Sequence, residues 1–243
     1  MTEFFSSIFG PIIKVLKPII YTPLLNILVF TYNFIPDLGV AIVLLTIVIR
    51  LIMLPSFHKS LKQQKKMQEL QPKINELRTK FKDDKQAEMK AMMELYKEHD
   101  VSPFGSCSTL LIQLPILAAL STLFARTGSD ALLHDLYSFV ATPEHFSTMF
   151  LGFIDLAAKN NYVLVGIASL LQYVQAKLSM PKHKVEDAMQ RSLQNSMLYF
   201  FPIILFVSIL ALPAGLALYI VVTTLFSIGQ QYYILRQEAK QSL

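Results

Sequence analysis

The fold of this chain is decided by residues 38–57, which read LGVAIVLLTIVIRLIMLPSF. A helix of twenty residues is about 30 Å long, close to the thickness of the hydrocarbon core of a bilayer. Arg50 is the only charged residue of this stretch, and no carboxylate lies within it to form an ion pair. A guanidinium at this depth costs on the order of a few kcal/mol unless water, a groove or a partner receives it. The pattern therefore predicts a membrane helix whose arginine serves a function.

The composition as a whole favours a membrane protein and excludes several other classes. Hydrophobic residues make up 53% of the 243 residues and charged residues only 16%, which is too apolar for an ordinary soluble domain. The net charge of +5 is too small to favour nucleic-acid binding. The single cysteine, Cys107, excludes an intrachain disulfide and a cysteine-rich metal site. Because the N-terminus resembles no signal peptide, transit segment or lipid anchor, we expect the spans themselves to direct the chain into a bacterial plasma membrane.

Four further apolar stretches complete a predicted all-α, polytopic membrane fold with a five-helix transmembrane bundle. The predicted spans are residues 38–57, 106–125, 162–180, 197–212 and 214–233. Before the first span, Asn26 and Asn33 share one face of an otherwise apolar stretch. This pattern predicts an amphipathic helix that lies in the membrane interface. Whether residues 11–35 lie on the membrane or cross it as a sixth span stays open.

The distribution of basic residues predicts the orientation of the bundle. Eleven of the 22 basic residues lie between residues 58 and 105, whereas the segment 126–161 holds only Arg126 and Lys159. Basic loops stay on the cytoplasmic side of a membrane. The expected cytoplasmic segments are residues 58–105, 181–196 and 234–243, and the expected extracytoplasmic segments are residues 1–37 and 126–161. The N-terminus is then outside and the C-terminus in the cytoplasm.

Residues 58–105 are predicted to form a cytoplasmic hairpin of two antiparallel helices. Apolar residues recur at spacings of three and four on both sides of Asp83-Asp84, where the pattern breaks. The residues of this predicted seam are Met67, Leu70, Ile74, Leu77, Phe81, Met89, Met92 and Tyr96. Pro72 is expected to kink or restart the first helix. We expect the hairpin to be a docking arm, although two solvated helices without a partner fit the pattern equally well.

The sequence contains no pattern typical of a catalytic or metal-binding site. The predicted spans hold no Asp or Glu, and all five histidines fall in predicted loops. Zinc-protease, nucleophile-elbow and phosphate-loop motifs are absent from the sequence. Ion-coupled pumps usually need carboxylates inside the membrane. We therefore expect neither an enzyme nor a pump, and neither a metal nor another cofactor.

Uncharged polar residues are instead arranged in stripes along four of the predicted spans. Side chains three, four or seven positions apart point to the same side of a helix, so these stripes can face one space together with Arg50. The candidate residues of this groove are Thr46, Arg50, Gln113, Gln172, Gln175, Tyr219, Thr223 and Ser227. Two alternatives stay open: Ser and Thr often bond their own helix backbone, and Arg50 could extend to the cytoplasmic surface.

Five motifs in the same order resemble the YidC/Oxa1/Alb3 family of membrane protein insertases. They are TIVIRLIMLP at 46–55, LQPK at 70–73, YKEHDVSPFG at 96–105, LIQLPI at 111–116 and PAGLALY at 213–219. The resemblance covers about residues 23–236. It departs from many members of the family in lacking a large extracytoplasmic domain and a lipobox cysteine, and Ser102 stands where Asn is frequent. The tail after Tyr233 has only two basic residues, which does not favour ribosome binding through the tail.

The resemblance implies a five-helix core with a hydrophilic groove that opens to the cytoplasm and to lipid and is closed on the outer side. It implies that Arg50 lies in this groove near Thr46, Gln113 and Tyr219, and that the hairpin receives substrates or partners. The implied partners are nascent membrane proteins and the lipid bilayer, and insertion is implied to occur independently or beside the Sec translocon, often with a ribosome. We expect a monomer, although the sequence leaves the oligomeric state and the dependence on Sec open. Its client proteins stay open.

The resulting hypothesis is an insertase that carries short hydrophilic segments of nascent membrane proteins through the groove and releases their apolar helices into the bilayer. A polar groove lowers the cost of removing such a segment from water, and Arg50 attracts its acidic residues. Two alternatives remain at this point: a small channel or facilitator that uses the same cavity, and an assembly chaperone without translocation activity.

Overall fold

The computed structural model describes residues 17–102, 105–126, 134–143, 147–180, 191–192 and 195–241. The described part is mainly helical, as predicted. Its helices are η1 (Lys17–Tyr21), α2 (Thr22–Phe34), α3 (Leu38–Ile52), α4 (Leu54–Lys80), α5 (Lys85–Glu98), α6 (Gly105–Arg126), α7 (Tyr162–Leu178), η3 (Ser196–Phe200), α9 (Phe201–Leu210) and α10 (Ala214–Gln241), where η denotes a π-helical segment. Strands β1 (Met149–Phe150) and β2 (Ile154–Asp155) form a short antiparallel hairpin. Residues 1–16, most of the loop 181–196 and part of the loop 126–161 lie outside the described residues.

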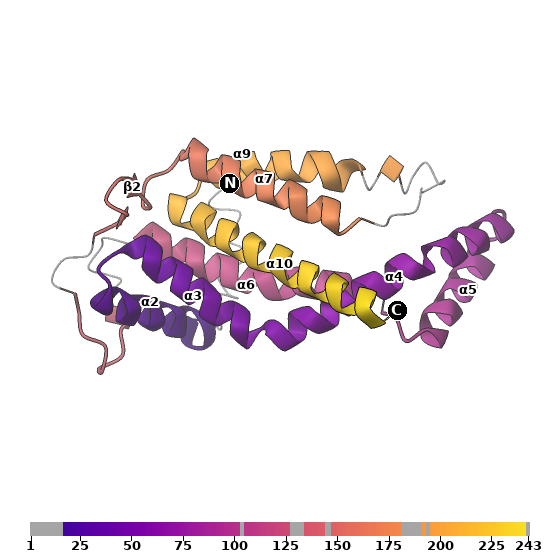
Figure 1. The fold of residues 1–243 in the computed structure, drawn as a ribbon, viewed down its shortest axis with the longest axis horizontal. Coiled ribbons are helices and arrows are strands. Elements are labelled where there is room, and N and C mark those ends of the chain that lie inside the picture. The colour runs from indigo at the N-terminus through magenta and orange to yellow at the C-terminus, as the bar shows by residue number, and fades with distance from the viewer. Residues whose placement is uncertain are drawn as a thin grey trace.

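Helix α10 forms the centre of the bundle. It packs against α3, α6, α7 and α9, and Figure 1 shows it running between the α7–α9 pair and the helices α3 and α6. Its N-terminal turns are buried because small and apolar residues alternate there, and Leu216, Ala217 and Tyr219 are at most 1% exposed. Gly215 leaves just enough space for Phe124 and Ile42, since a Cβ at Gly215 would lie 3.2 Å from the Phe124 ring. The main core is therefore built where α3, α6 and α10 meet.

Fewer of the described helices are long enough to cross a bilayer than the sequence pattern predicts. Within the described residues, one helix, Ala214–Ile234, is long and apolar enough to cross a bilayer, and the bent pair α3–α4 becomes a second if it is counted as one span. The apolar helices Gln113–Phe124, Tyr162–Leu178 and Leu198–Leu210 are shorter.

The helix predicted over residues 38–57 is not continuous in the structure. Helix α3 ends at Ile52, and α4 begins at Leu54 after a bend of 65°. Pro55 explains the position of this break, because proline lacks an N–H and its ring clashes with the carbonyl four residues earlier, whereas it fits the first turn of a new helix. Residues 54–57 therefore belong to the long hairpin helix. Pro72, in contrast, lies inside α4 without ending it, so the helix does not restart there, and a kink at Pro72 stays a prediction.

The end of the bundle opposite the helices α4 and α5, called the outer end below, is held by contacts between the loops and the first helices. Asp37 caps α3 through Val40 N at 3.0 Å, and its second carboxylate oxygen accepts a hydrogen bond from Leu151 N at 2.7 Å. The Phe150 ring lies directly on Gly39, where a Cβ would come within 1.9 Å of it. The carboxamides of Asn26 and Asn33 bond the backbone of the outer segment 134–143. The shared face of these two asparagines is thus used to hold a loop.

Candidate functional site

Arg50 lies in the last turn of α3 and points into the protein. Arg50 is only 4% exposed, and its Nη1 atom is buried without a hydrogen-bond partner. In the described part of the chain Arg50 forms no ion pair and no hydrogen bond. The guanidinium carbon Cζ lies 4.3 Å from the centre of the Phe57 ring. The side chain is thus buried in the protein and does not extend to the protein surface.

Tyr219 and Gln113 bring two further helices to the same region. Tyr219, from α10, is 1% exposed, and its hydroxyl oxygen accepts a hydrogen bond of 2.6 Å from Nε2 of Gln113 on α6. Tyr219 is also close enough to Arg50 for an electrostatic interaction. Helices α3, α6 and α10 thus gather three of the predicted groove residues at one place. We call Arg50, Gln113 and Tyr219 the arginine site.

Two other predicted groove residues bond their own helices. The Thr46 hydroxyl is fully buried and donates to the Ile42 carbonyl at 2.6 Å. The Ser227 hydroxyl donates to the Thr223 carbonyl at 3.0 Å. In both cases the hydroxyl hydrogen is used by the turn below, which is the backbone-bonded alternative. These residues can still accept a hydrogen bond from another group.

The remaining predicted groove residues lack hydrogen bonds to the described part of the chain. Gln172 and Gln175 are half-buried on α7, and Thr223 is buried on α10 with an unpartnered hydroxyl. The hydroxyls of Thr224 and Ser169 and the Nε2 atom of Gln230 are also buried without a partner. Nine in ten or more of the buried polar atoms in proteins find a partner. Such atoms on α3, α7 and α10 are therefore typical of a surface that receives polar groups.

A polar contact at the inner end of the bundle was missed by the sequence pattern. Gln231 of α10 is 9% exposed and donates through Nε2 to the hydroxyl of Ser179 at 3.2 Å. The backbone oxygen of Ser179 also accepts a hydrogen bond from Nε2 of Gln68 on α4. We call these three residues the inner clasp. It joins the hairpin helix to the ends of α7 and α10, and no periodicity links residues so far apart in the chain.

The hairpin closes on an apolar seam, but its second helix is rotated relative to the prediction. Leu70, Ile74, Leu95 and Val101 are its buried residues, and Met67, Leu77, Met92 and Tyr96 pack against them. Leu95 and Val101 were not predicted. Met89 is 65% exposed and does not belong to the seam, and Phe81 lies outside the buried cluster.

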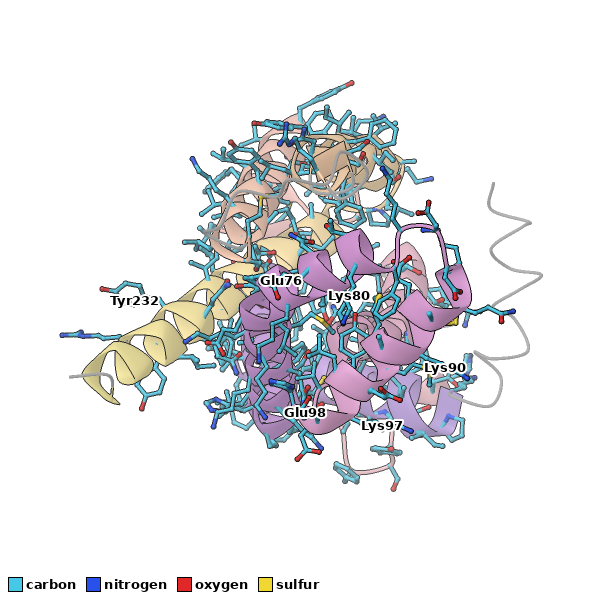
Figure 2. All side chains as sticks on the ribbon, turned by 90° about the vertical axis from the view of Figure 1, so that its right-hand side faces the viewer. Glu76, Lys80, Lys90, Lys97, Glu98 and Tyr232 are labelled. Atoms are coloured by element: carbon cyan, nitrogen blue, oxygen red, sulfur yellow. The ribbon has the colours of Figure 1, made fainter. Side chains whose placement is uncertain are left out.

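The burial of Leu95 explains this orientation, because an apolar side chain gains more by leaving water than an exposed ion pair contributes. Glu88 occupies the seam position next to Met89, with its side chain 13% exposed, and approaches Arg78 Nε at 3.8 Å and Lys85 Nζ at 3.1 Å. Burial raises the pKa of the Tyr96 phenol, and the positive charge of Arg78 opposes this shift. Figure 2, which views the molecule from the hairpin end, shows Glu76, Lys80, Lys90, Lys97 and Glu98 over the outside of the two helices. The hairpin therefore presents a charged surface with an exposed methionine.

Within the described residues, no group of three or more His, Cys, Asp or Glu side chains could hold a metal ion. The arginine site itself offers donors rather than metal ligands, because its groups are a guanidinium, a carboxamide and a phenol. The arrangement can bind an anionic or hydrogen-bond-accepting group.

Several known proteins are similar to this chain. A protein named membrane protein insertase YidC from Geobacter sulfurreducens is 35% identical over 218 residues, which are 88% of this chain and 36% of that protein. A protein of the same name from Wigglesworthia glossinidia brevipalpis is 35% identical over 219 residues, 90% of this chain and 37% of that protein. The chain thus spans little more than a third of the length of these relatives.

The fold is also similar to that of a solved structure, described as an active YidC insertase crystal structure with the first transmembrane domain resolved. The TM-score is 0.57 at 26% sequence identity, and the match covers 94% of this chain and 46% of the other. The family model described as 60Kd inner membrane protein matches residues 30–241, which is most of the chain. The chain therefore belongs to the 60Kd inner membrane protein family, the YidC/Oxa1 family that its five motifs predicted.

Proposed function

We propose that this protein is a membrane protein insertase that moves short hydrophilic segments of nascent membrane proteins part of the way across a bacterial plasma membrane. The observation that carries the proposal is the buried, unpaired guanidinium of Arg50 beside the Gln113–Tyr219 pair. A buried charge without a counter-charge is costly, and the cost falls when an acidic group of a passing segment reaches it. The names of the relatives support the same function.

The mechanism follows from the chemistry of the arginine site. The carboxylate of an arriving segment binds the guanidinium in a medium where charges are screened less than in water. Gln113, Tyr219 and the unpartnered hydroxyls of α10 offer hydrogen bonds to its backbone, which lowers the cost of leaving water. The apolar helix that follows then enters lipid, and the burial of its apolar surface drives the step. This sequence of events requires neither a nucleotide nor a metal.

The proposed topology has five spans, formed by α3, α6, α7, α9 and α10, with the hairpin α4–α5 in the cytoplasm. The outer contacts of Asp37, Asn26 and Phe150 support an insertase rather than a channel, because they join the loops to the ends of the helices on the side opposite the hairpin. A pore open at both ends would have to break them. The outward-facing charges of the hairpin suit a surface on which clients or partners dock.

The experiment that tests the proposal measures insertion into vesicles that contain the purified protein. The substrates are two single-span proteins that differ only in whether the translocated segment contains two aspartates or two asparagines. Arg50→Ala is expected to slow the acidic substrate about tenfold or more and the neutral one much less, and Arg50→Lys should retain most of the activity. If Arg50→Ala inserts the acidic substrate at the wild-type rate, the electrostatic step is wrong. If solute leaks through the vesicles without a substrate, the protein is a channel.

A further inference from the structure

The buried charge of Arg50 has an aromatic neighbour where a carboxylate would be expected. Phe57 is 8% exposed, and its ring centre lies 4.3 Å from Cζ of Arg50. This distance is well inside the roughly 6 Å limit for a cation–π interaction, which is strengthened when both partners are removed from water. The Phe57 ring thus lies directly against the guanidinium.

The kind of contact decides what remains available to a substrate. A guanidinium has five N–H donors at its edges, whereas an aromatic ring interacts with the cation through its π face. A carboxylate in the same place would neutralise the charge and occupy two donors. The ring does neither, and Nη1 of Arg50 remains without a partner. Phe57 therefore stabilises the cation and leaves it free to bind an anion.

The contact depends on the bend between α3 and α4. Arg50 is in the last turn of α3, and Phe57 is in the first turn of α4, with its N–H bonded to the Met53 carbonyl at 3.0 Å. Residues seven apart in a straight helix are separated by about 10 Å along the axis. The 65° bend at Met53 brings the ring back over the arginine. The position of the hairpin helix and the environment of Arg50 are thus coupled through one residue.

We propose that Phe57 is a positioning residue that holds the Arg50 guanidinium buried, charged and unpaired, so that it selects substrates with acidic translocated segments. The inference rests on the proposed function, and it adds the group that replaces a counter-ion. Phe57 acts through Arg50 and does not itself need to touch the substrate. Its contribution is therefore specific to acidic substrates, whereas loss of packing at this position would slow all substrates equally.

The test uses the two substrates described above and reports the ratio of their insertion rates, acidic over neutral. Phe57→Leu removes the ring and keeps an apolar side chain, and we expect the ratio to fall about 3- to 10-fold. Phe57→Tyr keeps a π face, and its ratio should stay within about twofold of the wild type. Phe201→Leu, at a half-exposed position on α9, is the matched control and should leave the ratio unchanged.

Because Phe57→Leu could also disturb folding, a second series keeps the size of the ring nearly constant. Phenylalanine with one, two and three ring fluorines at position 57 weakens the negative π face step by step. The ratio is expected to fall with each fluorine. A ratio that stays flat across the series, an equal slowing of both substrates, or a Phe57→Tyr variant as impaired as Phe57→Leu would overturn the inference.

The same assay separates this inference from the proposed function. Arg50→Gln is measured alone and together with Phe57→Leu. If Arg50→Gln lowers the ratio and Phe57→Leu lowers it no further in that background, the ring acts through the arginine as proposed. If Arg50→Gln lowers the ratio while Phe57→Leu alone does not, only the positioning role is wrong. If Arg50→Gln leaves the ratio unchanged, the electrostatic step of the proposed function fails, and the role of Phe57 fails with it.

Discussion

The outer end of the bundle and the region around Arg50 differ in how they use their polar side chains. At the outer end, Asp37, Asn26 and Asn33 use their side chains to bond loop backbone, and Gly39 lets Phe150 pack onto α3. In the middle and towards the hairpin, Arg50, Thr223 and Thr224 have buried atoms without partners. The Tyr21 hydroxyl is the exception at the outer end.

Because of this difference, one region of the bundle can keep a fixed arrangement while another can bind polar groups. Satisfied hydrogen bonds stabilise a single arrangement, because breaking any of them leaves a buried group unpaired. Buried polar groups without partners favour binding, because a polar group that reaches them supplies the missing hydrogen bonds. In the proposed mechanism, a substrate segment that enters from the hairpin end first reaches polar groups that gain hydrogen bonds by binding it, and then reaches an end whose hydrogen bonds would be lost on opening. The variants described next test this difference between the two regions.

The largest effect is expected when the receptive site reverses its charge. Arg50→Glu places a carboxylate where acidic segments are proposed to bind, and repulsion in this weakly screened environment is worth a few kcal/mol. Insertion of the acidic substrate should fall on the order of 100-fold, while a matched substrate with two lysines in the same segment should be affected least. The measurement is the insertion rate of each substrate into protein-containing vesicles. Equal losses for the acidic and basic substrates would point to misfolding, which thermal unfolding in detergent would detect.

The next effect concerns the closed end. Asp37→Ala removes both the cap on α3 and the hydrogen bond to Leu151 N. A lost cap costs about 1 kcal/mol, and a lost hydrogen bond to a charged group costs about 1.5–3 kcal/mol. We expect the free energy of unfolding in detergent to fall by about 2.5 kcal/mol, the lower end of the sum of these two terms, because Asp37 is only partly buried. Asp37→Asn, which keeps one acceptor oxygen for the cap, should lose about half as much, and an unchanged stability in both variants would mean that these bonds do not hold the outer end.

Packing at the same end gives a smaller effect. Gly39→Ala adds a Cβ that would lie 1.9 Å from the Phe150 ring, so the ring must move. Overpacking of this kind costs about 1–3 kcal/mol, and the side-chain freedom of Phe150 favours the lower part of that range. Phe150→Leu in the Gly39→Ala background should recover part of the loss. Additive losses in the double variant would show that the two residues do not compete for the same space.

Features that depend on residues close together in the chain could be predicted from the sequence. Helical periodicity located the helices and the break at Asp83-Asp84, because both depend on residues close in the chain. The polar stripes assigned Arg50, Gln113 and Tyr219 each to the polar face of its own helix. The packing of α10 against α3 and α6 brings these faces together. These features follow from local spacing and from the need to bury apolar faces.

The features that the sequence did not predict depend on contacts between different helices. A spacing of three and four residues fits Met89, Met92 and Tyr96 as well as Glu88, Met92 and Leu95, and the burial of Leu95 against the first helix favours the second set. The contact of Phe57 with Arg50 requires the bend at Met53, which a single proline signal could place but not orient. The inner clasp joins residues more than fifty positions apart. Tertiary contacts of this kind leave no periodic signal in one sequence.

The smallest effect is expected at the inner clasp, where the receptive region meets the hairpin. Gln68→Ala removes the hydrogen bond from α4 to the Ser179 backbone oxygen, and one neutral hydrogen bond is worth about 0.5–1.5 kcal/mol. The global unfolding transition should barely move, because the seam around Leu70 and Ile74 remains intact. Amide hydrogen exchange in α4 near residue 68 should instead rise about 3- to 10-fold, since local opening reports the lost bond directly. Gln64→Ala, one turn earlier on the same helix, is the control. If both variants exchange at the wild-type rate, the clasp does not restrain the hairpin, and the hairpin would then be held to the bundle mainly by the packing of α4 against α6.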